Sequence, residues 1–391
     1  MTTTIGTLTR DQLRSAAARY LPPGAPDSGR PDPWGYAELR TAGWQRAEVD
    51  GSFVVASGGT TGSPKIIALA PHLGVPLVAA AWQPLGENDV LLNLFPPGRM
   101  WGAHYFYNAV ALHSKASTVP MGALAPQELT AWADVIGELG VTALAGAPNV
   151  LARFAEAVAL SGIRLPVRSA LWSGEPLTAG HAAALAATFP GVGLWGNYGS
   201  IETFVIGVSR PDCGLGLQHL LPGQQLELDD SGALLTRVGE GWPIPAWRFR
   251  LGDRIGSATC PCGDEDAFQV LGRADDAFKL YGGLVRTSDL LSVTRSVEGI
   301  IDAQVVLFRD ADISAAVKGV LVRCTGTQDA AEVRRALLRG LNELEACDRH
   351  TPDAVRVEVV TELKQHPLTH KVLPVLWRDA AELDFKIGAL T

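Results

Sequence analysis

The chain of 391 residues is long enough for two or three domains. Hydrophobic residues make up 47% of it and charged residues 19%, which allows a large core and excludes a wholly disordered chain. Because 33 Lys and Arg stand against 41 Asp and Glu, the net charge is −8; with no long basic run, we expect no nucleic-acid partner.

No segment of the sequence is expected to cross a membrane or to direct the chain through one. Its apolar runs, such as Gly74–Trp82, are shorter than the ~18 residues that span a bilayer. The first residues, Met1–Arg14, carry early charge and lack the apolar stretch of a signal peptide. We therefore expect a cytoplasmic protein without a membrane partner, whose five cysteines are reduced. The oligomeric state cannot be read from the sequence.

Expected strands and helices alternate through the first two thirds of the chain. A helix is predicted at Thr9–Tyr20, before a Pro/Gly-rich stretch from Pro22 to Gly35. Strands are predicted at Phe53–Ala56, Val90–Phe95, Val141–Ala145 and Ala170–Ser173, and helices at Pro126–Leu139 and Val150–Leu160. This alternation predicts an α/β domain with mainly parallel sheets.

The pattern changes after Gly272 to that of a small α+β unit. Helices are predicted at Leu290–Ser296 and Asp329–Glu345, and strands at Asp302–Arg309, Val317–Cys324 and Val355–Thr361. The boundary is expected near Ala274–Asp276, where polar residues follow an apolar strand. The sequence thus predicts two domains, residues 1–274 and 275–391.

A loop rich in glycine and hydroxyl groups runs from Ser57 to Lys65, after the first predicted strand of this domain. Its sequence is Ser-Gly-Gly-Thr-Thr-Gly-Ser-Pro-Lys. Glycines let the backbone approach a ligand closely, and consecutive amides can form a concavity that binds an anion. The spacing is not that of a Walker A loop. The alternative is an ordinary loop without a ligand.

This string resembles the phosphate loop of the adenylate-forming superfamily, which includes acyl- and aryl-CoA ligases, carrier-loading adenylation domains and luciferases. Five further segments resemble its motifs in the same order: Ser173–Leu177, Asn197–Glu202, Phe249–Asp253, Gly272–Asp275 with Lys279–Gly282, and Pro367–Lys371. The short chain, the Asp275-Asp276 pair and the cysteine pattern resemble the phenylacetate–CoA ligase branch most. The resemblance implies a large N-terminal adenylate-forming domain and a small, mobile C-terminal lid.

The resemblance also implies the roles of individual residues toward ATP. Tyr198 would lie against the adenine, Asp253 would bind the ribose hydroxyls, and Glu202 would hold Mg²⁺. Lys65 would hold the departing pyrophosphate, and Lys371 would bridge the carboxylate and the α-phosphate. The further residues implied to bind ATP are Ser57, Gly59, Thr60, Thr61, Gly62, Ser173, Gly174, Glu175, Gly199, Ser200 and Arg273.

The implied reaction joins an aryl or small carboxylic acid to AMP. The acid and the α-phosphate are both negatively charged, so positioning and charge neutralisation supply most of the catalysis. The acyl-adenylate would pass to the thiol of CoA or of a carrier protein's phosphopantetheine. Asp275 is the implied hinge of the lid. The alternatives are a surface lysine at Lys371 and a turn or N-cap aspartate at Asp275.

Four residues form a candidate metal site. Cys260-Pro-Cys262 is a tight thiolate pair, and Cys213 and His219 lie upstream of it. Three sulfurs and one imidazole suit tetrahedral zinc with no open position, so we expect a structural Zn²⁺. Some short members of the phenylacetate–CoA ligase branch have a similar set. The alternative is unliganded, reduced cysteines.

The predicted acid pocket is aromatic. Trp101, His104 and Tyr105 lie where the superfamily's acid-binding motif falls, with Trp195 and Asn197 expected opposite them. Such a pocket suits a flat aryl acid better than a long acyl chain. The alternative is that these rings are core residues.

Four positions depart from the superfamily's motifs. Ile201 and Leu251 replace hydroxyl residues, His370 replaces a glycine, and Gly58 replaces a serine. Thr203 could supply the hydroxyl that Ile201 lacks, but with normal strand geometry its side chain is expected to point elsewhere. Two other functions therefore stay open. The adenylate could pass to an amine or be formed from an oxyanion other than a carboxylate, or the chain could be a nucleotide-binding regulator without activity.

Overall fold

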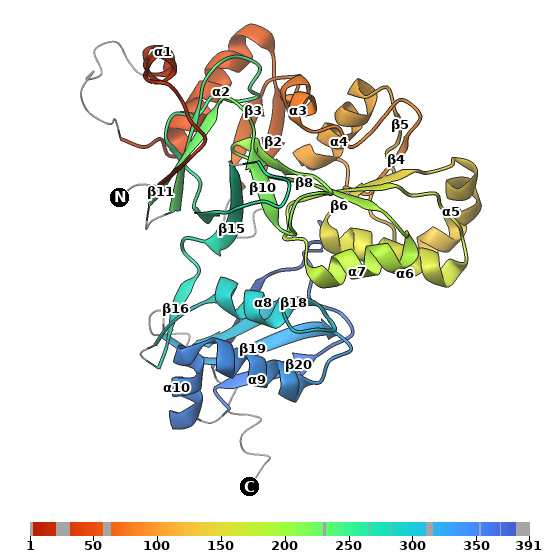
Figure 1. The fold of residues 1–391 in the computed structure, drawn as a ribbon, viewed down its shortest axis with the longest axis vertical. Coiled ribbons are helices and arrows are strands. Elements are labelled where there is room, and N and C mark those ends of the chain that lie inside the picture. The colour runs from red at the N-terminus through yellow and green to blue at the C-terminus, as the bar shows by residue number, and fades with distance from the viewer. Residues whose placement is uncertain are drawn as a thin grey trace. The chain divides into compact units, whose positions relative to one another are not determined.

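The computed structural model describes residues 3–20, 32–57, 64–229, 232–264, 266–281, 283–309, 316–351, 353–367 and 369–380. The chain forms two compact units (Figure 1). Unit 1 comprises Met1–Pro176 and Leu185–Leu271, and unit 2 comprises Leu177–Ala184 and Gly272–Thr391.

Unit 1 begins with strand β1 (Thr3–Ile5), and two helices follow it, α1 (Arg10–Tyr20) and α2 (Tyr36–Asp50). The helix predicted at Thr9–Tyr20 is confirmed, and most of the Pro/Gly-rich stretch lies outside the described residues. Helix α2 was not predicted. The antiparallel strands β2 (Phe53–Ala56) and β3 (Ile66–Leu69) follow it.

The largest sheet of unit 1 has nine strands in the order β14-β15-β10-β9-β8-β7-β6-β4-β5. Neighbours from β5 to β8 are parallel, whereas β8, β9, β10 and β15 pair antiparallel. The strands are β4 (Val90–Asn93), β5 (Ser117–Val119), β6 (Ala143–Gly146), β7 (Ser169–Ser173), β8 (Gly193–Ser200), β9 (Phe204–Ser209), β10 (Leu217–Leu220), β14 (Asp253–Ser257) and β15 (Ala267–Arg273). The predicted α/β class is therefore confirmed, with a parallel half next to an antiparallel one.

Helices cover both faces of the parallel half. Helix α4 packs on β4 and β5, and α6 packs on β6 and β7 from the opposite face (Figure 1). The helices of this region are α3 (Val75–Ala81), α4 (Gly102–His113), α5 (Pro126–Glu138) and α6 (Pro148–Ser161), whereas α7 (Ala179–Thr188) is divided between unit 2 and unit 1. The predicted helices at Pro126–Leu139 and Val150–Leu160 are confirmed as α5 and α6. The middle residues of the central strands β7 and β8 are buried, whereas Ser173 is half-buried at the end of β7 and Gly199 and Ser200 are exposed at the end of β8.

A second sheet of unit 1 is antiparallel, with the order β1-β11-β12-β13. Its strands are β1 (Thr3–Ile5), β11 (Gln224–Asp229), β12 (Gly232–Arg237) and β13 (Phe249–Arg250). Every residue of β12 is buried, so both faces of this strand are covered.

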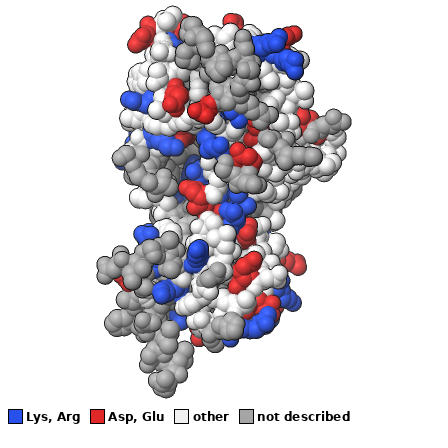
Figure 2. Space-filling view, turned by 90° about the vertical axis from the view of Figure 1, so that its left-hand side faces the viewer, with Lys and Arg blue, Asp and Glu red and all other residues white. Residues whose placement is uncertain are grey.

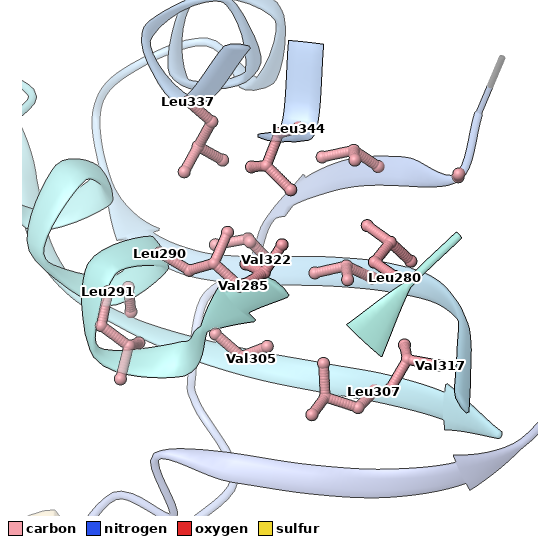
Figure 3. Packing of buried hydrophobic residues seen from close by; sticks show 14 of the residues in the cluster. Leu280, Val285, Leu290, Leu291, Val305, Leu307, Val317, Val322, Leu337 and Leu344 are labelled. Carbon is pink, nitrogen blue, oxygen red and sulfur yellow. The ribbon is translucent and has the colours of Figure 1, made fainter. Parts of the chain in front are cut away.

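Unit 2 holds one mixed sheet in the order β17-β16-β19-β18-β21, and β20 also pairs with β19. Its elements are β16 (Ala277–Leu280), β17 (Gly283–Arg286), α8 (Thr287–Arg295), β18 (Ile300–Arg309), β19 (Ala316–Gly326), α9 (Ala330–Gly340), α10 (Asn342–His350), β20 (Val355–Val359) and β21 (Val375–Asp379). Leu290, Val305, Val322 and Leu337 are each fully buried between the sheet and the helices (Figure 3). Burying one such side chain stabilises the fold by roughly 1.5–3 kcal/mol.

The single helix predicted at Asp329–Glu345 is wrong, because the structure has two helices there. Leu341 lies between α9 and α10 with φ −133° and ψ 100°, which is extended backbone. Gly340 precedes it, and glycine is a poor helix former. A Cβ on Gly340 would lie 3.3 Å from the methyl carbons of Val293 in α8, so the close packing there favours glycine and weakens the helix.

No helix among the described residues is long and apolar enough to cross a membrane. On the face drawn in Figure 2, Lys and Arg side chains lie interspersed with Asp and Glu side chains. That mixture matches the charge balance of the sequence.

Candidate active site

The base of the predicted phosphate loop is a closed hairpin. The N–H of Ser57 donates to the main-chain oxygen of Lys65, and the N–H of Lys65 donates to Ser57 Oγ, both at 2.9 Å. The hydroxyl of Ser57 thus stabilises the base of the loop by accepting a hydrogen bond. The residues between, including Gly59, Thr60, Thr61 and Gly62, lie outside the described residues.

Lys65 pairs with Glu202, which lies 137 residues further along the chain. The Nζ of Lys65 is 2.6 Å from Glu202 Oε1, and the Glu202 side chain is only 14% exposed. Burial by itself raises the pKa of Glu202, but the hydrogen bonds and the charge of Lys65 outweigh it and lower the pKa below its ordinary value. Glu202 is therefore a carboxylate at neutral pH, which is the form that a hard cation binds.

A tight turn between β8 and β9 carries Glu202. Ser200 Oγ accepts a hydrogen bond from the N–H of Thr203 at 3.2 Å, and the buried hydroxyl of Thr203 donates to the main-chain oxygen of Phe204. Thr203 therefore points into the protein, as expected, and does not replace the hydroxyl lost at Ile201. Gly199 is needed here, because a Cβ on it would lie 1.9 Å from the oxygen of Phe204.

Tyr198 and Asp253 form a second pair at the same end of β8. The Tyr198 hydroxyl donates to Asp253 Oδ2 at 2.6 Å, and its ring meets Phe268 edge to face at 5.7 Å between centroids. Tyr198 lies four residues before Glu202. Unit 1 thus brings Lys65, Glu202, Tyr198 and Asp253 to one region around the end of β8.

The end of the neighbouring strand β7 lies beside this region. Ser173 is hydrogen-bonded to the hydroxyl of Tyr107, which also accepts a hydrogen bond from Asn197 Nδ2 at 2.7 Å. Tyr107 is fully buried, and burial raises its pKa. Gly174 follows with a φ of +83°, which glycine adopts without strain, and Glu175 is half-buried.

The predicted pocket residues differ in their surroundings. His104 is 5% exposed, and its Nδ1 lies 2.6 Å from the main-chain oxygen of Phe95, so it is a buried polar wall. Tyr105 is 36% exposed and packs on Phe53. Trp101 and Trp195 are half-buried. Trp195 shares the face of β8 that carries Asn197, because side chains alternate along a strand.

The four predicted zinc ligands lie together. The ligand atoms of Cys213, His219, Cys260 and Cys262 are all within 4.8 Å of one another. A tetrahedral zinc with bonds of about 2.3 Å to sulfur separates two sulfurs by roughly 3.8 Å, so small side-chain rotations suffice to close this set. Three sulfurs and an imidazole, half-buried or buried, fit zinc.

Two groups around this cluster support metal binding. Asp264 Oδ2 lies 3.3 Å from His219 Nδ1, as in the carboxylate–histidine pairs that orient metal ligands. The N–H of Arg210 donates to Cys213 Sγ at 3.3 Å. Hydrogen bonds from neighbouring backbone N–H groups and from His219 outweigh burial and lower the pKa of Cys260 to about 6, which favours its thiolate.

Unit 2 carries Lys371 on a tight hairpin. Gln365 and Val372 form an isolated bridge, and the N–H of His366 donates to the main-chain oxygen of Lys371 at 2.8 Å. His370 has a φ of +55°, in the left-handed region that favours glycine. A glycine, which is the residue that His370 replaces in the motif that this segment resembles, would adopt this conformation without strain.

The predicted hinge residue Asp275 is exposed in unit 2 and pairs with Arg273, whose Nε lies 3.3 Å from Asp275 Oδ1. The neighbouring Asp276 is held differently. Its side chain is 7% exposed and accepts hydrogen bonds from Arg286 and from the N–H of Ser288. The structure thus fixes Asp276 within unit 2 and leaves the side chain of Asp275 at the surface.

Sequence reasoning missed three residues of this region: Tyr36, Tyr107 and Arg237. The Tyr36 hydroxyl accepts from the N–H of Ile66 at 2.6 Å and donates to its oxygen at 2.9 Å, next to Lys65. These residues lie outside the motifs that carry the resemblance. Tyr36 and Tyr107 have no distinctive sequence surroundings, and an arginine close after the apolar run Ala233–Leu235 would have been the only signal for Arg237.

Comparisons with known proteins agree with this arrangement. The family model described as "AMP-binding enzyme" matches residues 31–265, more than half of the chain. Indoleacetate–lysine synthetase of Pseudomonas savastanoi is 24% identical over 154 residues, which are 39% of this chain and 38% of that protein. The chain therefore matches little more than a third of that relative's length.

Solved structures share the fold. 2-Hydroxyisobutyryl-CoA ligase, in the postadenylation state with 2-HIB-AMP, matches with a TM-score of 0.68 at 15% identity, over 97% of this chain and 87% of that one. Anthranilate CoA ligase AuaEII with anthranoyl-AMP matches with a TM-score of 0.59 at 19% identity, over 86% and 66%. With the family model over most of unit 1, the chain belongs to the AMP-binding enzyme family and thus to the adenylate-forming superfamily.

Proposed function

We propose that the chain activates a carboxylic acid with ATP as an acyl-adenylate and then transfers the acyl group to a thiol. The observation that carries this proposal is the convergence of the Lys65–Glu202 and Tyr198–Asp253 pairs at the end of β8. One pair offers charges suited to phosphates and a cation, and the other an aromatic ring beside a carboxylate suited to a nucleoside.

The proposed step forms one bond and breaks one bond. A carboxylate oxygen of the acid attacks the α-phosphorus, and the bond from that phosphorus to the pyrophosphate oxygen breaks, with both electrons leaving on pyrophosphate. Lys65 would bind the pyrophosphate, and Lys371 would neutralise the carboxylate and α-phosphate. Glu202 would hold Mg²⁺, which when bound neutralises phosphate charge.

The proposed acceptor is the thiol of CoA or of a carrier protein. 2-Hydroxyisobutyryl-CoA ligase and anthranilate CoA ligase, which share the fold, are CoA ligases by name. An amine acceptor is the second candidate, because the matching segment of indoleacetate–lysine synthetase comes from an enzyme named for joining an acid to lysine. That the chain is most similar to the phenylacetate–CoA ligase branch of the superfamily stays a prediction.

The proposed acid is aryl or small. Tyr105 is 36% exposed and Trp101 and Trp195 are half-buried, and the polar ring of His104 meets Tyr105 edge to face at 5.6 Å between centroids, so aromatic surface and a polar group occur together. An aryl acid would gain from the rings, and a small acid would need the polar groups.

Incubating the protein with ATP, Mg²⁺ and a panel of aryl and small acids tests the proposal. We expect pyrophosphate release that depends on one class of acid, and a thioester when CoA or a phosphopantetheine-bearing carrier is added. An amide formed with lysine in place of the thioester would favour the second acceptor. Tight ATP binding with no pyrophosphate from any acid would instead indicate a nucleotide-binding regulator.

We further propose that Cys213, His219, Cys260 and Cys262 hold a structural zinc. Metal analysis should find about one zinc per chain. Cys262→Ser should lose the zinc and lower the midpoint of thermal unfolding, whereas Cys347→Ala, which changes a buried cysteine of unit 2, should keep the zinc. A wild-type protein that contains no metal and is nevertheless fully stable would contradict this site.

A further inference from the structure

Arg237 is buried without a carboxylate partner. It ends β12, its exposed fraction is 0%, and no ion pair to it exists among the residues that the structure describes. A buried charge costs several kcal/mol unless hydrogen bonds satisfy it. Its partners should therefore reveal why the chain keeps an arginine here.

Those partners are main-chain oxygens around the turn that carries Glu202. Nη1 of Arg237 donates to the oxygen of Thr203 at 2.6 Å, and Nη2 donates to the oxygen of Val205 at 2.8 Å. Nη1 also lies 3.2 Å from the oxygen of Ile244. The guanidinium thus binds the peptide oxygens on both sides of Phe204.

Gln224 extends the same support. Its Oε1 accepts from Arg237 Nε at 2.9 Å, and its Nε2 donates to the oxygen of Ile206 at 2.6 Å. The Trp242 ring packs against the guanidinium, with 4.4 Å from Cζ to the ring centroid. Arg237 and Gln224 together hold three oxygens of the segment that follows Glu202.

The segment needs such support because Phe204 is strained. Its φ is +59°, a left-handed conformation that is unfavourable for a bulky residue. Phe204 is 8% exposed and lies two residues after Glu202. A strained conformation persists only where its surroundings fix it, and relaxing it would move the start of β9 and the turn before it.

We propose that Arg237 is a positioning residue that holds the β8–β9 turn, and so the carboxylate of Glu202, in the geometry for Mg²⁺ and the phosphates of ATP. This inference rests on the proposed role of Glu202 and extends it to a residue outside the superfamily motifs. Burial lowers the pKa of Arg237 to about 9, so the guanidinium stays charged at neutral pH. Charged donors form the stronger hydrogen bonds with carbonyl oxygens.

The Arg237→Lys variant tests the proposal, because lysine keeps the charge but cannot bind two separated oxygens with a planar fork. The affinity for ATP is measured by calorimetry without acid, over a series of MgCl₂ concentrations and in EDTA. We expect the Mg²⁺ concentration for half-maximal enhancement to rise about 10-fold or more, as for other residues that orient metal ligands. ATP affinity in EDTA should stay unchanged.

Arg248→Lys is the matched control. Arg248 is also an arginine of this region, with a side chain only 12% exposed, but its Nε pairs with Glu227 Oε1 at 3.1 Å. Both variants should lose thermal stability, and only Arg237→Lys should shift the Mg²⁺ dependence. Equal Mg²⁺ dependence in the two variants would overturn the proposal and leave Arg237 a purely structural residue.

Gln224→Met removes the hydrogen bonds of Gln224 to Arg237 and to the oxygen of Ile206, and it keeps the buried charge of Arg237. It should shift the Mg²⁺ dependence in the same direction by a smaller factor, and it keeps the test available if Arg237→Lys fails to fold. If Arg237→Lys fails to fold and Gln224→Met has the Mg²⁺ dependence of the wild type, the proposal is overturned. A wild-type protein that binds Mg²⁺ and ATP but activates no acid would contradict only the proposed reaction. If the ATP affinity of the wild type does not depend on the Mg²⁺ concentration, the proposed roles of Glu202 and Arg237 are overturned.

Discussion

Replacing Lys371 with alanine should reduce acid-dependent pyrophosphate release by about 10²- to 10³-fold, the usual effect of removing one group that stabilises developing charge. The reason is the repulsion between the carboxylate and the α-phosphate, which a single ammonium group between them offsets. Transfer of the acyl group from a supplied acyl-adenylate to the thiol should continue at the wild-type rate, since that step needs no attack on ATP. Quenched assays of both half-reactions measure the difference.

Lys364→Ala is the control for this variant. Lys364 is an exposed lysine of the same unit, seven residues earlier, and it contacts Gln304 through its main chain. Both half-reactions should be unaffected by its loss. An equal decrease of adenylation and transfer in Lys371→Ala would contradict the assigned role and would indicate damage to the fold of unit 2.

The parts of the site that the sequence predicted are those whose chemistry lies within a short segment. Tyr198 and Glu202 could be proposed together because one strand and one turn carry both. Their partners could be proposed only through the resemblance, because Lys65 reaches Glu202 across 137 residues and no spacing rule gives that distance. Arg237 was beyond prediction for the same reason, since its role depends on oxygens of a different strand.

In the fold, too, elements with a clear local pattern could be predicted, whereas elements held by contacts with distant segments could not. Strand β4 begins with the apolar run Val90–Leu92, and all of its residues after Val90 are buried, so the sequence pattern predicts it. Helix α2 has only Leu39 and Gly43 buried, which gives no apolar stripe. A Cβ on Gly43 would lie 2.7 Å from the oxygen of Ala68, so this helix is held by close packing on β3 that its sequence pattern does not reveal.

The Glu202→Gln variant should separate the metal from the nucleotide. Glutamine keeps the size of the side chain and removes the charge that pairs with Lys65 and that would hold Mg²⁺. We expect Mg²⁺-dependent pyrophosphate release to fall by about 10²-fold or more. In EDTA, by contrast, ATP should bind more tightly than to the wild type, because the carboxylate no longer repels its phosphates and Lys65 is released from its ion pair to bind them.

Glu87→Gln, which neutralises an exposed glutamate of unit 1, is the control and should change neither measurement. The opposite signs of the two effects distinguish a metal-holding carboxylate from one that only supports the fold, because a destabilised site would lose ATP affinity with and without Mg²⁺. Pyrophosphate release at the wild-type rate in Glu202→Gln would remove this residue from the metal site. Weaker ATP binding in EDTA would show that the Lys65–Glu202 pair stabilises the loop for the nucleotide rather than competing with it.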